Sequence, residues 1–243
     1  MAKGQNIFIS GESRLIEEYA AMCALKKIPV AVRANPGEKP KLSKGVAKAS
    51  RPSKSITLAL ELTNTSANAK KENLIFLDAA LASSIPIISS SVTVTVAEQS
   101  SWIKNPQRLI GIGAMPSLLE GGLLEFATSP VTNDRTVVQA KVFSSAIGKD
   151  IAFVQDSIGL VMPRILCMLT NEAYFAMAEG VAAGGDIDTA MKLGTNYPSG
   201  PVERAGKIGL KQIHAVLSAL HRYFGEDRYR VAPLLQQAVF MGA

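Results

Sequence analysis

The chain has 243 residues, of which 47% are hydrophobic and 19% charged, and its formal net charge is +6. This balance predicts a soluble globular protein of one large or two modest domains with a sizeable core. Six cations lie within residues 39–54, which contain no acid, so the positive charge is local and does not indicate a nucleic-acid-binding face. This basic loop is either a solvated connection or a site that attracts an anion, such as a phosphorylated cofactor or an acidic partner.

Strands and helices alternate from the N-terminus. Short apolar runs predict strands at Ile7–Ile9, Val30–Val32, Ile56–Leu60, Ile85–Ser89 and Leu109–Gly111. Helices are predicted at Ala67–Leu81 and at Glu12–Lys27, the latter with an apolar face on Leu15, Tyr19, Met22 and Leu25. The Pro-, Gly- and Lys-rich residues 35–54 predict a loop. The alternation predicts a mostly parallel sheet covered on both faces.

Cysteine usage and hydropathy indicate the compartment. Cys23 and Cys167 lie in apolar helical contexts, which predicts free thiols in a reducing, cytoplasmic setting. The first residues lead into a strand without a signal-peptide hydrophobic region. Residues 79–97 are uncharged and long enough to suggest a membrane span, but they contain Pro86 and five serines. Because Val92–Val96 alternates in the manner of a strand, we expect buried sheet there and no membrane partner.

The second half of the sequence changes from alternating strands and helices to mostly helices. A helix is expected at Asp134–Ile147 and a strand at Ile151–Val154, after which helices dominate. The apolar stretch Ile158–Val181 predicts a core helix that ends near Gly184. We therefore expect an α/β domain over residues 1–155 followed by an all-α domain over residues 156–243.

The most specific motif lies in this helical half. Asp186–Pro201 predicts a short helix that ends at Gly194 as a left-handed C-cap, then a Pro-Ser-Gly-Pro turn into a new helix. The motif, with Ile208-Gly209-Leu210 after it, resembles the C-terminal domain of the 3-hydroxyacyl-CoA dehydrogenases. Asn171–Ala173 and Glu179–Ala182 are similar to short sequence motifs of the family. The resemblance extends over residues 61–210. It implies a Rossmann-like, NAD-binding-type domain followed by a helical domain that dimerises.

The resemblance also locates the family's catalytic positions. The family's general-base histidine falls at Gly113, and the carboxylate that orients it falls twelve residues on, at Glu125. The two substrate-contacting positions fall at Val92 and Pro163. Of these four, only Glu125 keeps the family residue. The chain's two histidines, His214 and His221, lie on one face of a late helix, where we expect a structural or surface role.

The implied cofactor site is also altered. Dinucleotide binding needs a glycine turn through which backbone N–H groups reach the pyrophosphate. Gly11 occupies the first glycine position, and Ser13 and Ile16 occupy the others. Acidic residues lie beside this turn and would repel a pyrophosphate; they are Glu12, Glu17 and Glu18. Arg33 stands where the ribose-binding acid is expected, and it would favour a 2′-phosphate if any dinucleotide bound.

Three functions from different classes follow. The first is a protein that keeps the dehydrogenase fold without its reaction and acts as a ligand-binding or interaction protein, holding an acyl-CoA-like ligand or pairing with a relative. The second is an active NAD(P)-dependent 3-hydroxyacyl-CoA-type oxidoreductase centred on Glu125, with Lys149 or a tyrosine assisting. The third is a structural or assembly role of the helical half. We expect the first, as a homodimer and without a metal.

Overall fold

The computed structural model describes residues 4–242. The chain divides between Leu160 and Val161 into two compact units, here called the strand unit and the helical unit. The sequence placed a domain boundary near residue 155, directly after the last predicted strand. In the structure this strand ends at Phe153, and the seven residues after it, 154–160, still belong to the strand unit.

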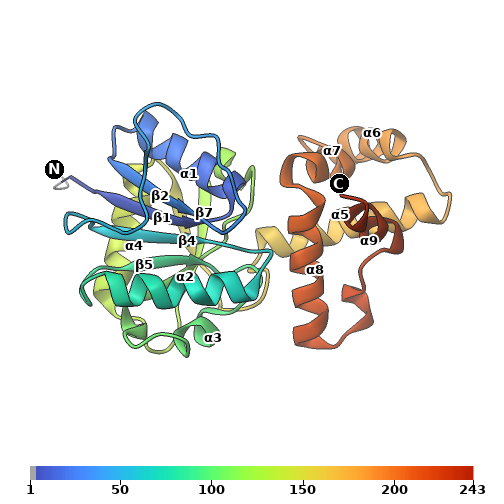
Figure 1. Cartoon of the computed structure of the whole chain (residues 1–243). Helices are drawn as coiled ribbons and strands as arrows, with labels where there is room; N and C mark the ends of the chain where they lie inside the picture. Colours follow the sequence, from blue (N-terminus) through green and yellow to red (C-terminus); the bar gives the residue numbers. More distant parts are fainter. Residues whose placement is uncertain (1–3, 243) are drawn as a thin grey trace. The chain divides into compact units, whose positions relative to one another are not determined.

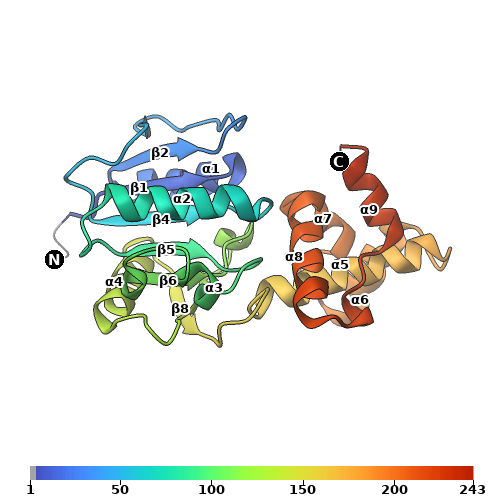
Figure 2. The ribbon, with the colours of Figure 1, turned by 60° about the horizontal axis from the view of Figure 1, so that its bottom comes forward.

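The strand unit is built on one eight-stranded sheet with the order β3-β2-β1-β4-β5-β6-β7-β8. Its strands are β1 (Ile7–Gly11), β2 (Val30–Ala34), β3 (Ala47–Lys48), β4 (Leu58–Leu62), β5 (Ile87–Ser90), β6 (Leu109–Ile112), β7 (Leu123–Ala127) and β8 (Asp150–Phe153). All neighbours pair in parallel except β6 and β7, which are antiparallel. Figure 2 shows the parallel strands side by side, with their ends along one edge. The α/β class expected from alternating strands and helices is confirmed.

Helices cover both faces of the sheet (Figure 1). One core joins the sheet to α1 (Ser13–Leu25) and α4 (Asp134–Ala146), and the other joins it to α2 (Ala67–Ala80) and α3 (Val96–Ser100). Strands buried on both faces explain why their sequences are continuous apolar runs. Short 3₁₀ turns lie at Pro106–Arg108, Leu118–Glu120 and Asp227–Tyr229.

The strand expected at Val92–Val96 is absent, and this prediction was wrong. The alternating valines are all buried, but Val92 and Val94 lie in the turn before α3, and Val96 is the first residue of that helix. The Thr95 side chain accepts a hydrogen bond from Glu98 N and so begins the helix. The carboxylate of Asp156 accepts from Val96 N and Ala97 N, at 2.8 Å each, which satisfies the first two amides of the helix.

Two smaller expectations also fail in the strand unit. Leu25 was placed on the apolar face of the first helix, but it is 75% exposed. The buried stripe of α1 runs through Ile16, Ala20 and Cys23, and Leu25 lies about 200° around the helix from Cys23. The basic loop was expected to lack regular structure, yet β3 lies within it and pairs with β2 at the edge of the sheet.

Two buried ion pairs fasten α2, one to β4 and one to the 3₁₀ turn before β6. Lys70 on α2 pairs with Glu61 on β4, and both side chains are almost fully buried. Arg108 donates to the Asp78 carboxylate at 2.7 Å and to backbone carbonyls of Asp78 and Ala82. Burial alone would raise the pKa of Asp78, but hydrogen bonds from Arg108, Lys104 N and Asn105 outweigh it and hold the pKa below its ordinary value.

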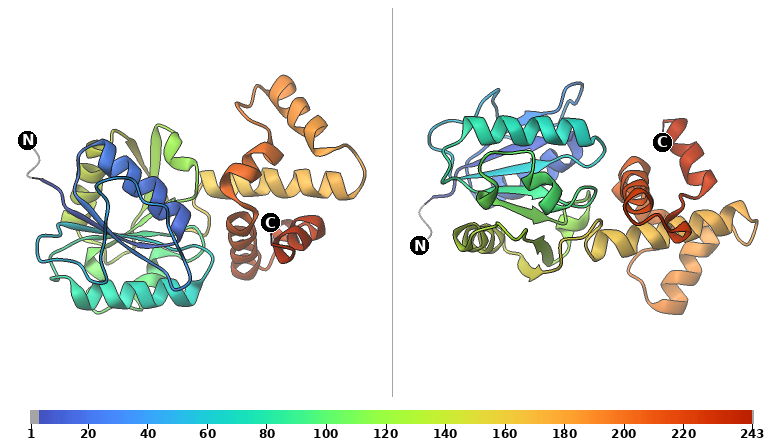
Figure 3. Two further views of the ribbon diagram at one scale, coloured as in Figure 1. Left: turned by 45° about the horizontal axis from the view of Figure 1, so that its top comes forward. Right: turned by 90° about the horizontal axis from the view of Figure 1, so that it is seen from below.

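The helical unit consists of α5 (Met162–Ala178), α6 (Gly184–Thr195), α7 (Pro201–Ile208), α8 (Leu210–Phe224) and α9 (Pro233–Phe240). Helices α7, α8 and α9 pack on α5, and both views of Figure 3 show this arrangement. Helix α5 is shorter than the predicted Ile158–Val181, because Gly159 and Leu160 have φ values of 78° and 47°, which prevent the helix from starting earlier. None of the helices within residues 4–242 is long and apolar enough to cross a membrane.

The carboxylate of Asp188 explains the sequence motif at Asp186–Pro201. Asp188, on α6, accepts hydrogen bonds from Val202 N and Glu203 N, at 2.8 Å each, and so caps the first turn of α7. Gly200 must be small, because a Cβ there would lie 2.1 Å from Asp188 Oδ1. Gly194 was expected to be a left-handed cap, but it lies within α6, and Asn196, with φ of 56°, takes that conformation. Asparagine tolerates it better than most residues.

Candidate functional site

The positions singled out in the first half of the sequence gather along one edge of the sheet. Strands β1, β2, β4, β5 and β6 run in the same direction, so their carboxyl ends share an edge. Ligands of open α/β sheets bind outside this edge. Gly11 and Arg33 lie in the ends of β1 and β2, and Gly113 directly follows β6.

Gly113 and Glu125 are neighbours across the β6–β7 pair. Gly113 N donates a hydrogen bond to Glu125 O at 2.9 Å. A Cβ at residue 113 would lie 3.6 Å from Glu125 Oε2 and 3.3 Å from Leu160 Cδ1. Thus the Glu125 carboxylate faces the position where the resemblance places the family's histidine, and Leu160 packs against the same position.

The remaining candidate catalytic residues lie in different parts of the chain. Val92 is fully buried, and its carbonyl accepts from Gly159 N at 2.9 Å, in the segment that leads to Leu160. Pro163 is a buried residue in the first turn of α5, in the other unit. Lys149, which is half-buried, donates to Gly121 O at 2.8 Å, so the structure shows it holding a turn before β7.

Polar residues that the sequence did not single out fix the loop after β6. Asn64 Nδ2 donates to Ala114 O at 2.8 Å, and Ser90 Oγ lies 3.2 Å from the same carbonyl. Ser90 Oγ also donates to Asn64 Oδ1 at 2.6 Å. Ser90 ends β5 and Asn64 lies two residues after β4. Polar residues at or just after the ends of buried strands are the signal that could have identified them.

The turn between β1 and α1 keeps one glycine for a steric reason. A Cβ at Gly11 would lie 2.3 Å from Leu62 O, and the residue has φ of 152°. The next backbone amides are already occupied. Glu12 N donates to Leu62 O at 3.0 Å, and Ser13 N donates to the Glu38 carboxylate at 3.0 Å.

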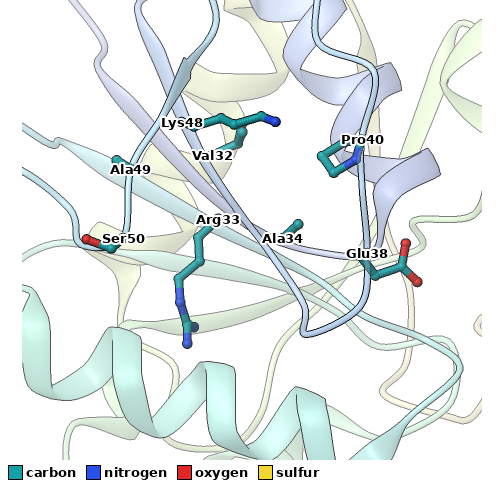
Figure 4. Close-up of a pocket in the computed structure, with 8 residues that line it drawn as sticks. All are labelled: Val32, Arg33, Ala34, Glu38, Pro40, Lys48, Ala49 and Ser50. Atoms are coloured by element: carbon teal, nitrogen blue, oxygen red, sulfur yellow. The ribbon is translucent and has the colours of Figure 1, made fainter.

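Arg33 borders a pocket of about 310 Å³ below the basic loop (Figure 4). Its lining is Val32, Arg33, Ala34, Glu38, Pro40, Lys48, Ala49 and Ser50. The Arg33 guanidinium extends toward α2, where it donates to Asn73 Oδ1 at 3.1 Å and lies 4.2 Å from the centre of the Phe76 ring. Arg33 is therefore held by partners within the protein.

These residues do not fit the dinucleotide that the resemblance implies. The N–H of Ser13 already donates to the Glu38 carboxylate. A pyrophosphate at the same N–H would be repelled by that negative charge. No acid ends β2, and Arg33 is engaged with α2.

The two histidines belong to α8 in the helical unit. The His214 ring centre lies 6.4 Å from that of Phe240, and burial lowers the pKa of His214. Among the described residues, no cluster of His, Cys, Asp and Glu could hold a metal ion.

Comparisons with known proteins identify the family. Residues 159–243 match the model of the 3-hydroxyacyl-CoA dehydrogenase C-terminal domain. A 3-hydroxybutyryl-CoA dehydrogenase of Bradyrhizobium diazoefficiens is 33% identical over 156 residues, which are 64% of this chain and 53% of that protein. One from Clostridioides difficile is 31% identical over 186 residues, covering 76% of this chain and 66% of that protein. The chain thus spans about half to two thirds of the length of these relatives.

Solved structures show the same fold. The (S)-3-hydroxybutyryl-CoA dehydrogenase of Ralstonia eutropha has a TM-score of 0.80 at 24% identity, covering 99% of this chain and 95% of that one. FadB2 of M. tuberculosis has a TM-score of 0.85 at 20% identity, covering 98% and 94%. The Rossmann-like strand unit, the helical unit and the matched sequence therefore agree: this chain belongs to the 3-hydroxyacyl-CoA dehydrogenase family.

Proposed function

We propose that this chain keeps the family's fold without its hydride-transfer reaction, and acts as a ligand-binding or interaction protein for an acyl-CoA-like ligand. The observation that carries the proposal is Gly113. It presents no proton acceptor beside Glu125. Losing a positioned general base costs about 10²- to 10⁴-fold in rate.

The second candidate is an NAD(P)-dependent 3-hydroxyacyl-CoA-type oxidoreductase in which Glu125 itself moves the proton. One observation favours it: Glu125 stays 7% exposed at the carboxyl edge of the sheet, next to Gly113. A carboxylate shielded from water can serve as a general base when its pKa suits the working pH. The two candidates differ in whether Glu125 supports turnover.

The deciding experiment measures NADH and NADPH consumption with acetoacetyl-CoA for the wild type and for Glu125→Gln. We expect both proteins to consume NADH and NADPH only at the background rate measured without protein. We also expect calorimetry to detect acetoacetyl-CoA binding when neither dinucleotide is present. The matched positive control is the C. difficile relative at equal concentration. Consumption by the wild type that falls at least about tenfold in Glu125→Gln would instead establish the oxidoreductase.

We also propose a homodimer through the helical unit. Large apolar side chains are exposed there, with exposed fractions of 71% for Val181, 83% for Leu193 and 74% for Phe240. Exposed large apolar side chains favour a protein partner, and the resemblance implies a second copy of the chain.

Light scattering after size exclusion tests the dimer. We expect a dimer for the wild type and a monomer for Phe240→Asp, because a charge inside an apolar interface is costly to bury. Leu25→Asp is the control, since Leu25 is 75% exposed but lies in the strand unit. A wild-type monomer at all concentrations, or equal effects of both substitutions, would contradict this prediction.

A further inference from the structure

Carboxylates of the chain itself occupy the place where a dinucleotide fold receives its pyrophosphate. Ser13 N belongs to the first turn of α1, whose amides have no partner within the helix. Such amides bind the phosphates of nucleotides in folds of this class. Here Ser13 N donates to Glu38 Oε2 at 3.0 Å.

A second contact holds the segment that carries Glu38. Lys41 N, in the basic loop, donates to Glu17 Oε1 on α1 at 2.6 Å. The two hydrogen bonds run in opposite directions, one from helix to loop and one from loop to helix. Pro40, between them, is buried. The segment 38–41 is therefore fastened to α1 at both ends.

The neighbouring amides are satisfied in the same way. The side chain of Glu12 is buried, and its Oε1 accepts from Asn64 N at 2.8 Å, from Thr65 N at 2.6 Å and from Thr65 Oγ1 at 2.8 Å. These amides follow β4, the strand next to β1 in the sheet. An anion entering this edge meets donors that already hold carboxylates.

We propose that Glu38 is a built-in anionic cap on α1, and that this cap determines whether a nucleoside diphosphate or dinucleotide binds at the turn. One N–H cannot serve both a carboxylate and a phosphate, and the two anions repel each other. The inference deepens the proposed function, on which it rests for the absence of dinucleotide binding. The pocket that Glu38 lines also contains Lys48 and Arg33, so removing Glu38 leaves the pocket with two cations and no acid.

Calorimetry with ADP and NADH tests the cap in the full chain. We expect no detectable binding to the wild type, and binding to Glu38→Ala that is at least about tenfold tighter than the weakest Kd the titration can detect, equivalent to about 1.4 kcal/mol. Glu38→Gln removes the charge but keeps an oxygen that can accept from Ser13 N, so its gain should be smaller. Glu72→Gln makes the same charge change at an exposed position on α2 and should not gain binding.

The outcomes separate this proposal from the proposed function. If folded Glu38→Ala and Glu38→Gln bind no better than the wild type, the cap is refuted, whereas the absence of turnover would stand. If the wild type binds NADH with Glu38 present, the cap is likewise refuted. The consumption of NADH with acetoacetyl-CoA then decides between the two candidate functions. Should Glu38→Ala fail to fold, Glu38→Gln alone decides: any gain over Glu72→Gln supports the cap, and none overturns it.

Discussion

Replacing Lys70 with methionine should lower the free energy of unfolding of the strand unit by about 3–5 kcal/mol, the usual cost of leaving one charge of a buried pair without its partner. Glu61 would lose its ion-pair partner while its side chain has no exposed surface. Lys70 Nζ also donates to Ser90 O at 2.7 Å, so the substitution leaves a buried carbonyl without that donor.

Urea unfolding followed by the fluorescence of Trp102 measures this effect, since the chain has one tryptophan and it packs on the core beside α2. The matched control is Lys70→Met combined with Glu61→Gln, which removes the uncompensated charge. We expect the double variant to be more stable than Lys70→Met alone. A single variant within about 0.5 kcal/mol of the wild type would show that the pair does not stabilise the fold.

Substitution of Gly200 by alanine should destabilise the helical unit by about 2–4 kcal/mol. The new methyl group would overlap Asp188 Oδ1, and also Asp188 Cβ at 2.3 Å, so a change of side-chain rotamer cannot relieve the contact. Either α7 shifts or the carboxylate leaves Val202 N and Glu203 N, and both hydrogen bonds are charge-assisted.

Thermal unfolding followed by far-ultraviolet circular dichroism measures the loss. Gly206→Ala provides a control within the same helix, because a Cβ there would meet nothing within 4 Å. Alanine at an open helical position should be neutral or stabilise by about 0.5–1 kcal/mol. Equal midpoints for both variants would refute the steric account of the motif.

The course of the chain through the strand unit was predictable because its physical signals are local. Strands such as β1 and β4 are buried on both faces, so their apolar runs mark them in the sequence. The failure at Val92–Val96 came from treating alternation as sufficient. Thr95 and Glu98 have the spacing of a helix-starting capping box, and this signal should have outweighed the alternation.

The site was predictable only where the resemblance supplied positions. Gly113 and Glu125 lie side by side because they pair across two strands, and twelve residues of separation alone do not reveal that. Glu38 was not predicted, since it is 25 residues from Ser13 and the contact depends on how the loop returns to α1. Its only sequence signal is that it is the acid directly before a basic stretch without acids.

The short strand β3 matters for what the sheet presents to other chains. An edge strand with free N–H and C=O groups invites pairing with a neighbouring molecule, and thus aggregation. One edge ends in a two-residue strand that carries the exposed Lys48. At the other edge, β8 begins at the exposed Asp150, and Lys141 lies over the Phe153 ring at 5.5 Å. Both edges are thereby charged and short, so the sheet is protected from edge-to-edge association.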